Sequence, residues 1–378
     1  MTAHPPAIPI LNLYYLLAYA WDCLEAQERP AAASHDGDGP DAAGHLASVL
    51  VAAVARLFRQ GFPRGYVERS EDASRVSGRV DMGESLRRLL LRQAKAHCRH
   101  DEFAADIPPN RILRATLEWI ARSGESVSGD TRRQAGRLLD RFPEVRREPL
   151  NAAMFRTLSM NRHWKDARLA LTLCLLLARR FTGDERLGRG LLPDYRRDER
   201  RMAVLFERFV HNFYRREAKG FFRSIGRQRI PWDLADDAES REAASRLLPG
   251  METDVSLVSE TSHVVVECKY CSHILAGRSF GGDGTEGRLR GDHFRQIYAY
   301  LANLRRQNPG RRLSGLLLYA QSEPFEPGTI ALRDGVSVTV APLDLYRRWP
   351  DIRRDLLRWV GLPARSIDAY SGALSPKP

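Results

Sequence analysis

The stretch over residues 248–271 reads LPGMETDVSLVSETSHVVVECKYC. It predicts two short strands, 252–257 and 263–270, joined by a polar turn. Side chains alternate across a strand, so Glu267 and Lys269 share one face. Two charged side chains at the end of an apolar strand are costly unless they serve each other or a ligand. The hairpin is therefore the first candidate for a functional site.

The hairpin carries the residue types that a hard divalent cation needs. Asp254 on the first strand and Glu267 on the second offer carboxylate oxygens, which suit Mg²⁺ or Mn²⁺. The backbone carbonyl of Cys268, next to Glu267, is a candidate third metal ligand. Lys269 is expected to position the attacking water or to offset charge in the transition state of phosphodiester hydrolysis. The alternative is an ordinary edge hairpin with a surface Glu–Lys pair.

Elements predicted on both sides of the hairpin complete an α/β core. Apolar residues at helical spacing predict a helix over about 198–221, and a second helix is expected over 292–306. Glu207 lies on the flank of the first helix, whereas Gln296 and Tyr300 lie on one face of the second. The order helix, strand, strand, helix, strand is typical of an α/β fold. The remaining expected elements are strands over 313–320, 329–333 and 336–340 and a helix over 343–359.

The first half of the chain is predicted to be mainly helical with a small β element, which makes the whole chain α+β. The β element is a strand–turn–strand over 65–81. An apolar block over 8–21 indicates core, or support for a partner-docking surface. A charged segment with several glycines, 183–201, marks a boundary between an N-terminal domain, 1–190, and a second domain, 191–378. Helices are expected over 46–58, 86–97, 112–122, 131–142 and 166–181.

Composition narrows the function classes. The 378 residues carry 59 Lys and Arg against 47 Asp and Glu, and the net charge of +12 favours a nucleic-acid partner, with an arginine-rich proteome as the alternative. No apolar run reaches the roughly 20 residues of a membrane span, and five cysteines suit a reducing compartment, so a cytoplasmic protein is expected. The chain has no G-x-x-x-x-G-K-[ST] motif, so we do not expect it to be a P-loop NTPase.

The ordered motifs resemble those of a known family. A helical acid at Glu207, the D…E-x-K strands and the Q-x3-Y helix follow the order of the PD-(D/E)XK nucleases of the RecB-like branch. The resemblance narrows to McrC, the nuclease-subunit family of the McrBC modified-cytosine restriction systems. It implies that Glu207 assists the metal shell and that Gln296 and Tyr300 orient the site or touch DNA. The blocks that carry the narrower resemblance are 8–22, 101–103 with 110–113, 205–210 and 248–254, whereas 30–45 and 277–291 look like insertions.

The same resemblance implies partners. McrC works with McrB, a hexameric AAA+ GTPase that binds the GTP and reads the DNA, and the N-terminal part of McrC engages the hexamer and stimulates its GTPase. The expected function is therefore that of a Mg²⁺-dependent endonuclease that cuts double-stranded DNA when this partner activates it. A homodimer through the nuclease domain is a further expectation. The alternative is a DNA-binding adaptor that activates the GTPase without cutting.

Charged residues of the N-terminal domain are the candidates for contact with the partner. The strand–turn–strand carries a charged tip with too little apolar content to pack on its own domain. Arg69 or Arg75 at this tip, or Arg79 at its base, is placed to reorganise a nucleotide site in trans. A second candidate surface runs from Asp101 to Arg111. The alternative is a solvated surface hairpin.

Overall fold

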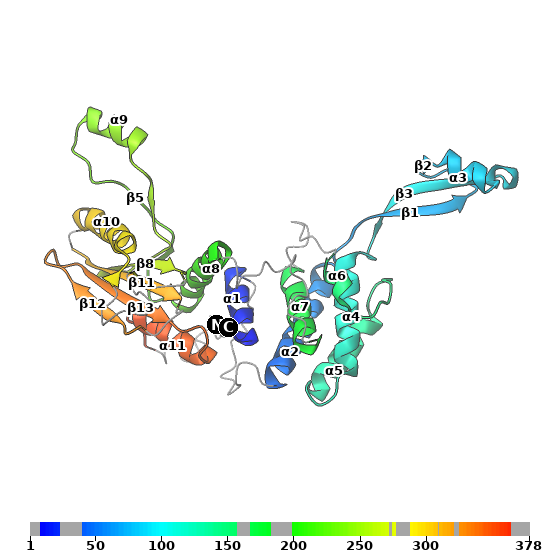
Figure 1. The fold of residues 1–378 in the computed structure, drawn as a ribbon, viewed down its shortest axis with the longest axis horizontal. Helices are drawn as coiled ribbons and strands as arrows, with labels where there is room; N and C mark the ends of the chain where they lie inside the picture. Colours follow the sequence, from blue (N-terminus) through cyan, green and yellow to red (C-terminus); the bar gives the residue numbers. More distant parts are fainter. Residues whose placement is uncertain are drawn as a thin grey trace, which may run out of the picture. The chain divides into compact units, whose positions relative to one another are not determined.

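A computed structural model gives the fold of the chain (Figure 1). It describes residues 8–22, 40–156, 167–182, 199–271, 274–276, 288–308, 310–320 and 325–363. The chain divides into two compact units, which we call the helical unit (residues 39–193) and the sheet unit (residues 1–38 and 194–378). The predicted insertions over 30–45 and 277–291 lie mostly outside the described residues.

The sheet unit is built on a six-stranded mixed sheet with the order β12-β13-β11-β8-β7-β4. Strands β8, β11 and β13 run parallel, and β4, β7 and β12 pair antiparallel with their neighbours. This arrangement confirms the predicted α/β class. The strands are β4 (Ser224–Gly226), β7 (Val255–Val258), β8 (Ser262–Lys269), β11 (Arg312–Ala320), β12 (Gly328–Ala331) and β13 (Ser337–Leu343).

Helix α10 (Gly291–Gln307) covers one face of this sheet and connects the parallel strands β8 and β11. Ile297 and Leu301 of α10 are fully buried in a core that includes Val265 of β8. The helix lies close because residue 315 is glycine: a Cβ there would lie 2.7 Å from Ile297 Cδ1. This close packing brings the polar residues of α10 within reach of the end of β8.

The sheet unit also contains the helices α8 (Glu199–Glu217) and α11 (Trp349–Trp359) and several short elements. The predicted order around the site is confirmed. The last helix begins at Trp349 rather than at 343, because β13 continues to Leu343. The short elements are β5 (Arg229–Ile230), α9 (Ala238–Leu247), β6 (Met251–Glu252), β9 (Leu275–Ala276) and β10 (Arg288–Leu289).

The first helix, α1 (Ile10–Ala20), belongs to the sheet unit, which differs from the predicted domain of residues 1–190. It lies beside α8 in Figure 1, and Asn212 Nδ2 donates to the carbonyl oxygen of Tyr19 at 2.9 Å. The Tyr15 ring stacks on Trp349 with 4.4 Å between centroids. The aromatic block therefore finds its apolar partners in the sheet unit, far away in sequence, and forms core there.

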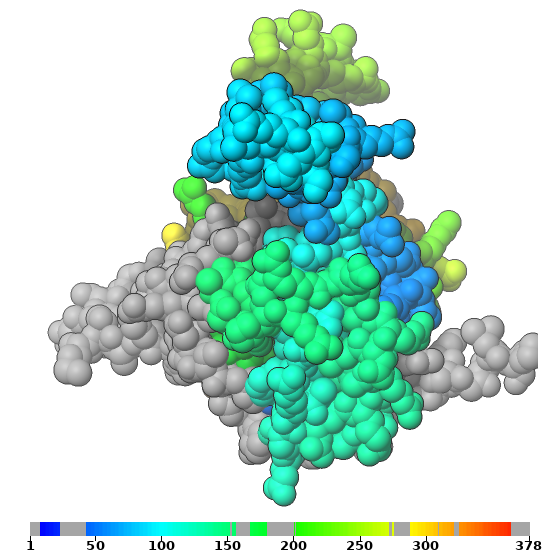
Figure 2. Space-filling view, turned by 90° about the vertical axis from the view of Figure 1, so that its right-hand side faces the viewer, coloured from blue at the N-terminus to red at the C-terminus, as the bar shows by residue number. Residues whose placement is uncertain are grey.

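Among the described residues of the helical unit, five helices lie outside a long β arm, which projects from them in Figure 1 and is seen end-on in Figure 2. Four of the five predicted helices are confirmed. No helix in the described part of either unit is long and apolar enough to cross a membrane. The five helices are α2 (Pro40–Gln60), α4 (Pro108–Arg122), α5 (Gly129–Asp140), α6 (Ala152–Arg156) and α7 (Arg168–Thr182).

The β arm, residues 65–104, corrects the predicted strand–turn–strand over 65–81. Strand β1 (Gly65–Ala73) pairs antiparallel with β3 (Ala96–Ala104), and the short β2 (Arg79–Val80) lies on the other side of β3. In the order β1-β3-β2, β1 pairs with β3, which is distant in sequence. It does not pair with β2, the next strand along the chain.

The helix predicted over 86–97 is also wrong. The chain forms α3 (Met82–Arg87) and a 3-10 turn, η1 (Leu90–Gln93), before it enters β3. Leu89 and Ala94 adopt left-handed backbone angles, with φ of 53° and 54°, which interrupt a continuous helix.

Candidate active site

The candidate site lies where β8 ends against α10. Glu267 and Lys269 project from β8 toward α10, and the Glu267 side chain is only 3% exposed. Asp254 immediately precedes β7, the antiparallel neighbour of β8. The two strands that the sequence predicts therefore bring Asp254, Glu267 and Lys269 to one end of the sheet.

Gln296 of α10 is the hub of the polar network at this site. Its Nε2 donates to Glu267 Oε1 at 2.7 Å and to the Tyr300 hydroxyl at 3.0 Å. Lys269 Nζ donates to Gln296 Oε1 at 2.8 Å and to Glu267 Oε1 at 3.1 Å. The Tyr300 hydroxyl in turn donates to the Glu252 carbonyl at 3.1 Å. One carboxylate oxygen of Glu267 is thereby fixed by two donors.

Asp254 is tied to the backbone of β8. Its Oδ2 accepts a hydrogen bond from the Cys268 amide at 2.8 Å. This contact joins Asp254 to the strand that carries Glu267 and orients its carboxylate. Cys268 therefore contacts the site through its backbone N–H group, which binds Asp254. The role of its carbonyl oxygen as a metal ligand stays a prediction.

The electrostatics of the site show an excess of buried negative charge. Burial, together with the charges of Glu267 and Glu207, raises the pKa of Asp254 to about 7. Burial also raises the pKa of Glu267, although Lys269 opposes this shift. Glu267 Oε2 is buried and has no hydrogen-bond partner among the described residues. The carboxylates are therefore not neutralised by the side chains around them.

The two carboxylates fit a divalent cation. The described residues contain no group of three or more His, Cys, Asp and Glu side chains arranged to hold a metal. Mg²⁺ is usually bound by one or two carboxylates together with water and substrate phosphates, so Asp254 and Glu267 suffice as its protein ligands. The unpartnered Oε2 of Glu267 is the oxygen that such an ion would satisfy.

Arg227 and His211 lie near the site, although the sequence did not suggest them as site residues. Glu207 of α8 forms an ion pair with Arg227, which follows β4, instead of contacting Asp254 directly. His211, one helical turn after Glu207, lies 3.2 Å through its Nδ1 from the Asp254 carbonyl oxygen. His211 shares a helix face with Glu207 and could have been found by that spacing. Nothing in the sequence around Arg227 points to the ion pair.

Four of the five predicted partner-contact residues lie on the β arm, and the fifth lies on α4. Arg69 donates to Glu102 at 2.7 Å across the paired strands β1 and β3, and Arg75 lies in the exposed turn after β1. Arg79 and Asp101 both line a cavity of about 520 Å³ on the arm. Arg111 lies in α4, where it pairs with Asp106, so Asp101 and Arg111 do not form one charged cluster.

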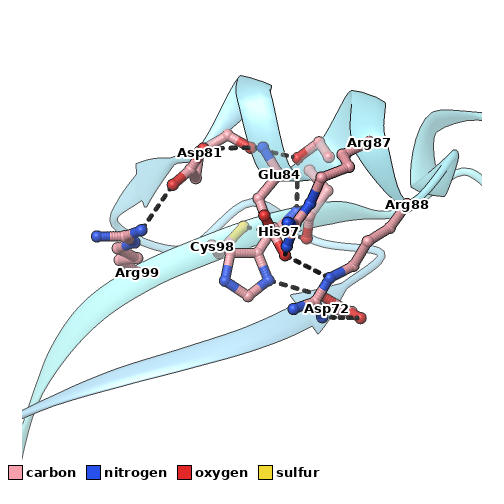
Figure 3. A network of polar contacts seen from close by, with 10 residues as sticks. Asp72, Asp81, Glu84, Arg87, Arg88, His97, Cys98 and Arg99 are labelled. Atoms are coloured by element: carbon pink, nitrogen blue, oxygen red, sulfur yellow. Dashed lines mark hydrogen bonds and ion pairs between the residues drawn. The ribbon is translucent and has the colours of Figure 1, made fainter.

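The far end of the β arm is held by a separate polar network, drawn in Figure 3. Asp72 lies 2.7 Å from His97 across the paired strands, and Asp81 caps the start of α3 by accepting from the Glu84 amide. Asp81 also pairs with Arg99 at 2.7 Å. These contacts fix α3 against the strands and give the end of the arm a defined shape.

A match to a family model shows which family the chain belongs to. The model described as "McrBC 5-methylcytosine restriction system component" matches residues 12–320, which include most of both units and the whole candidate site. The chain belongs to this family. The resemblance inferred from the sequence motifs is thereby confirmed.

Individual relatives of this McrBC family member are known. The type IV methyl-directed restriction enzyme EcoKMcrBC of Escherichia coli K12 is 26% identical over 352 residues, which cover 93% of this chain and 97% of the relative. A structure of Thermococcus gammatolerans McrB AAA+ hexamers with bound McrC gives a TM-score of 0.40 at 16% identity and covers 93% of this chain and 75% of that chain. The T. gammatolerans McrBC complex gives 0.34 at 19% identity, over 46% and 56% of the two chains.

Proposed function

We propose that this McrBC family member is the nuclease subunit of a modification-dependent restriction system, with a PD-(D/E)XK site that hydrolyses DNA phosphodiesters. One observation carries the proposal: Glu267 presents a buried, unpartnered carboxylate oxygen beside Asp254 and Lys269. Two carboxylates and a lysine at the end of one hairpin are what metal-assisted hydrolysis of a phosphodiester requires.

Each residue of the site has a separate role in this proposed reaction. Asp254 and Glu267 would hold the Mg²⁺ or Mn²⁺, and the bound ion would polarise the phosphate and lower the pKa of a water molecule. Lys269, held by Glu267 Oε1 and Gln296 Oε1, directs a positive charge to the place where negative charge develops. Gln296 and Tyr300 keep Glu267 in one orientation. This geometry leaves Glu267 Oε2 for the ion.

The partner proposal rests on the family and on the β arm. Systems of this family combine a nuclease with a McrB-like AAA+ GTPase hexamer, which binds the GTP and recognises the modified DNA. We propose that the β arm engages this hexamer. Large apolar side chains at the end of the arm are 48–58% exposed, and they supply the contact area that the predicted charged tip lacks: Met82, Leu86, Leu89 and Leu91.

Three substitutions test the nuclease proposal in the complete complex with the GTPase partner. Asp254→Ala, Glu267→Gln and Lys269→Ala are each expected to abolish Mg²⁺-dependent cleavage of methylated duplex DNA while the GTPase stays stimulated, because the β arm belongs to a different compact unit. Cleavage by any of the three variants at a rate comparable to the parent would show that the site is assigned wrongly.

A further inference from the structure

A second polar site adjoins the candidate active site on the α8 side. It is a cavity of about 380 Å³ whose lining includes the basic side chains of Arg208, His211 and Arg227. The lining is completed by Ala20 and Asn212, so every lining residue belongs to the sheet unit. A cavity of this size admits a phosphate group together with ordered water.

The cavity is connected directly to the catalytic carboxylates. His211 faces the cavity and also contacts the Asp254 carbonyl oxygen through Nδ1 at 3.2 Å. Glu207, one helical turn before His211, forms the ion pair with Arg227 at the edge of the same cavity. Glu207 also contributes to the raised pKa values of Asp254 and Glu267, which shows how near it lies to them.

The wall of the cavity is held in place by the packing of α1 on α8. Asn212 Nδ2 donates to the carbonyl oxygens of Tyr19 at 2.9 Å and Ala20 at 3.3 Å, at the end of α1. Arg208 precedes Asn212 by one turn and is exposed. The guanidinium group of Arg208 is therefore carried by a rigid helix and not by a loop, which reduces the entropy lost on binding an anion.

We propose that this cavity binds a backbone phosphate of DNA close to the scissile one, and that Arg227 exchanges Glu207 for that phosphate. The inference rests on the nuclease function proposed above and names the part of its substrate that this surface holds. Arginine binds phosphate oxygens through two parallel N–H groups, and such contacts fix the register of a protein on a duplex.

The ion pair of Arg227 with Glu207 permits this exchange. The side chains are 44% and 24% exposed, and an ion pair open to solvent contributes little to stability. A DNA phosphate can therefore displace the Glu207 carboxylate at small cost. Glu207 is then free to join the metal shell, the role that the family resemblance implies for it. Phosphate capture and completion of the metal site are thereby coupled through one arginine.

Salt dependence of DNA binding by the full chain tests the proposal. Binding of a fluorescent duplex is measured by anisotropy in EDTA, so that no cleavage occurs. Arg227→Ala and Arg208→Ala are each expected to lower affinity about five- to tenfold and to flatten the plot of log K against log salt by about 0.9, the change for one lost phosphate contact. The matched control is Arg223→Ala, which removes an exposed arginine four residues before Arg227 and outside the cavity.

A double-mutant cycle tests the exchange itself. Glu207→Gln is expected to increase metal-free DNA affinity in the parent, because Arg227 is released from its ion pair. The increase should be several times smaller in the R227A background, where only the general loss of a negative charge remains. Equal increases in both backgrounds would overturn the exchange.

The outcomes separate this inference from the nuclease proposal. Equal salt slopes for R227A, R208A and R223A in folded variants would overturn the phosphate site, even if the parent cuts DNA. If R227A does not fold, R208A on the exposed face of α8 carries the same test. A loss of affinity for free GTP instead of duplex would show that the cavity binds nucleotide and that the DNA assignment is wrong. Absence of cleavage by the parent complex would refute the nuclease proposal and leave the salt slopes to decide on the site.

Discussion

Replacement of Gln296 by leucine is the most direct test of the network that holds the candidate active site. Gln296→Leu removes two hydrogen bonds to charged partners, Glu267 and Lys269, and one to the neutral Tyr300 hydroxyl. Bonds to charged groups contribute about 1.5–3 kcal/mol each and a neutral bond about 1 kcal/mol. Lys269 keeps its contact with Glu267, and leucine adds apolar packing. We therefore expect the free energy of unfolding to fall by about 2–4 kcal/mol.

The same substitution should also weaken metal binding. Glu267 Oε1 loses its shortest contact, at 2.7 Å, so the carboxylate is no longer held in one orientation. Loss of a residue that orients a metal ligand typically costs about 10–100-fold in affinity or activity. Isothermal titration with Mn²⁺ measures this loss, and urea unfolding measures the stability.

Gln307→Leu is the matched control on the same helix. Gln307 is exposed and donates a single hydrogen bond, at 3.2 Å to the Pro231 carbonyl, so its loss should cost less than about 1 kcal/mol and leave Mn²⁺ binding unchanged. The reasoning about Gln296 would be refuted if the two variants had equal Mn²⁺ affinity and equal stability.

Three further predictions concern the arm, the sheet and the unit boundary. Leu86→Ser should lower GTPase stimulation at least about tenfold without changing stability, whereas Leu247→Ser, at a leucine that is even more exposed but lies in the sheet unit, should leave it unchanged. Burial lowers the pKa of His263 to about 4. The unfolded chain therefore binds the extra proton below about pH 6.5, so from pH 7 to 5 the stability of the parent relative to His263→Leu should fall by about 2 kcal/mol, by urea unfolding of both proteins. Residues 39–193 should be soluble in gel filtration, whereas residues 1–190 should aggregate because α1 loses its partners.

Local patterns of the sequence placed the polar residues of the candidate site on two faces. Alternation along 263–270 places Glu267 and Lys269 on one face, and helical spacing places Gln296 and Tyr300 on another. The structure joins these two faces because α10 belongs to the crossover that connects the parallel strands β8 and β11. Contacts between neighbouring elements of this kind follow from the order of the elements alone.

Contacts between distant segments could not be predicted in this way. The partner of β1 is β3, which begins more than twenty residues after β1 ends, and the short-range pattern instead favoured a turn to β2. The partner of α1 is α8. By its sequence alone, the aromatic block of α1 fits the core of either unit equally well. The Glu207–Arg227 ion pair depends on where β4 joins the sheet. In each case the local sequence allows several pairings of similar energy, and tertiary packing determines which of them forms.

The charge balance of the site favours a cutting enzyme over an adaptor that uses the same residues for structure only. A buried carboxylate whose pKa is raised to about 7 destabilises the fold whenever it is ionised, and the unpartnered Oε2 of Glu267 adds the cost of lost hydration. Apolar residues of similar volume would fill a purely structural position at lower cost. Lys269 alone does not neutralise Asp254 and Glu267, because it contacts only one of the two. This charge balance therefore supports our proposal that a cation, held by the two carboxylates beside a lysine and an arginine-lined cavity, serves phosphate chemistry at this site.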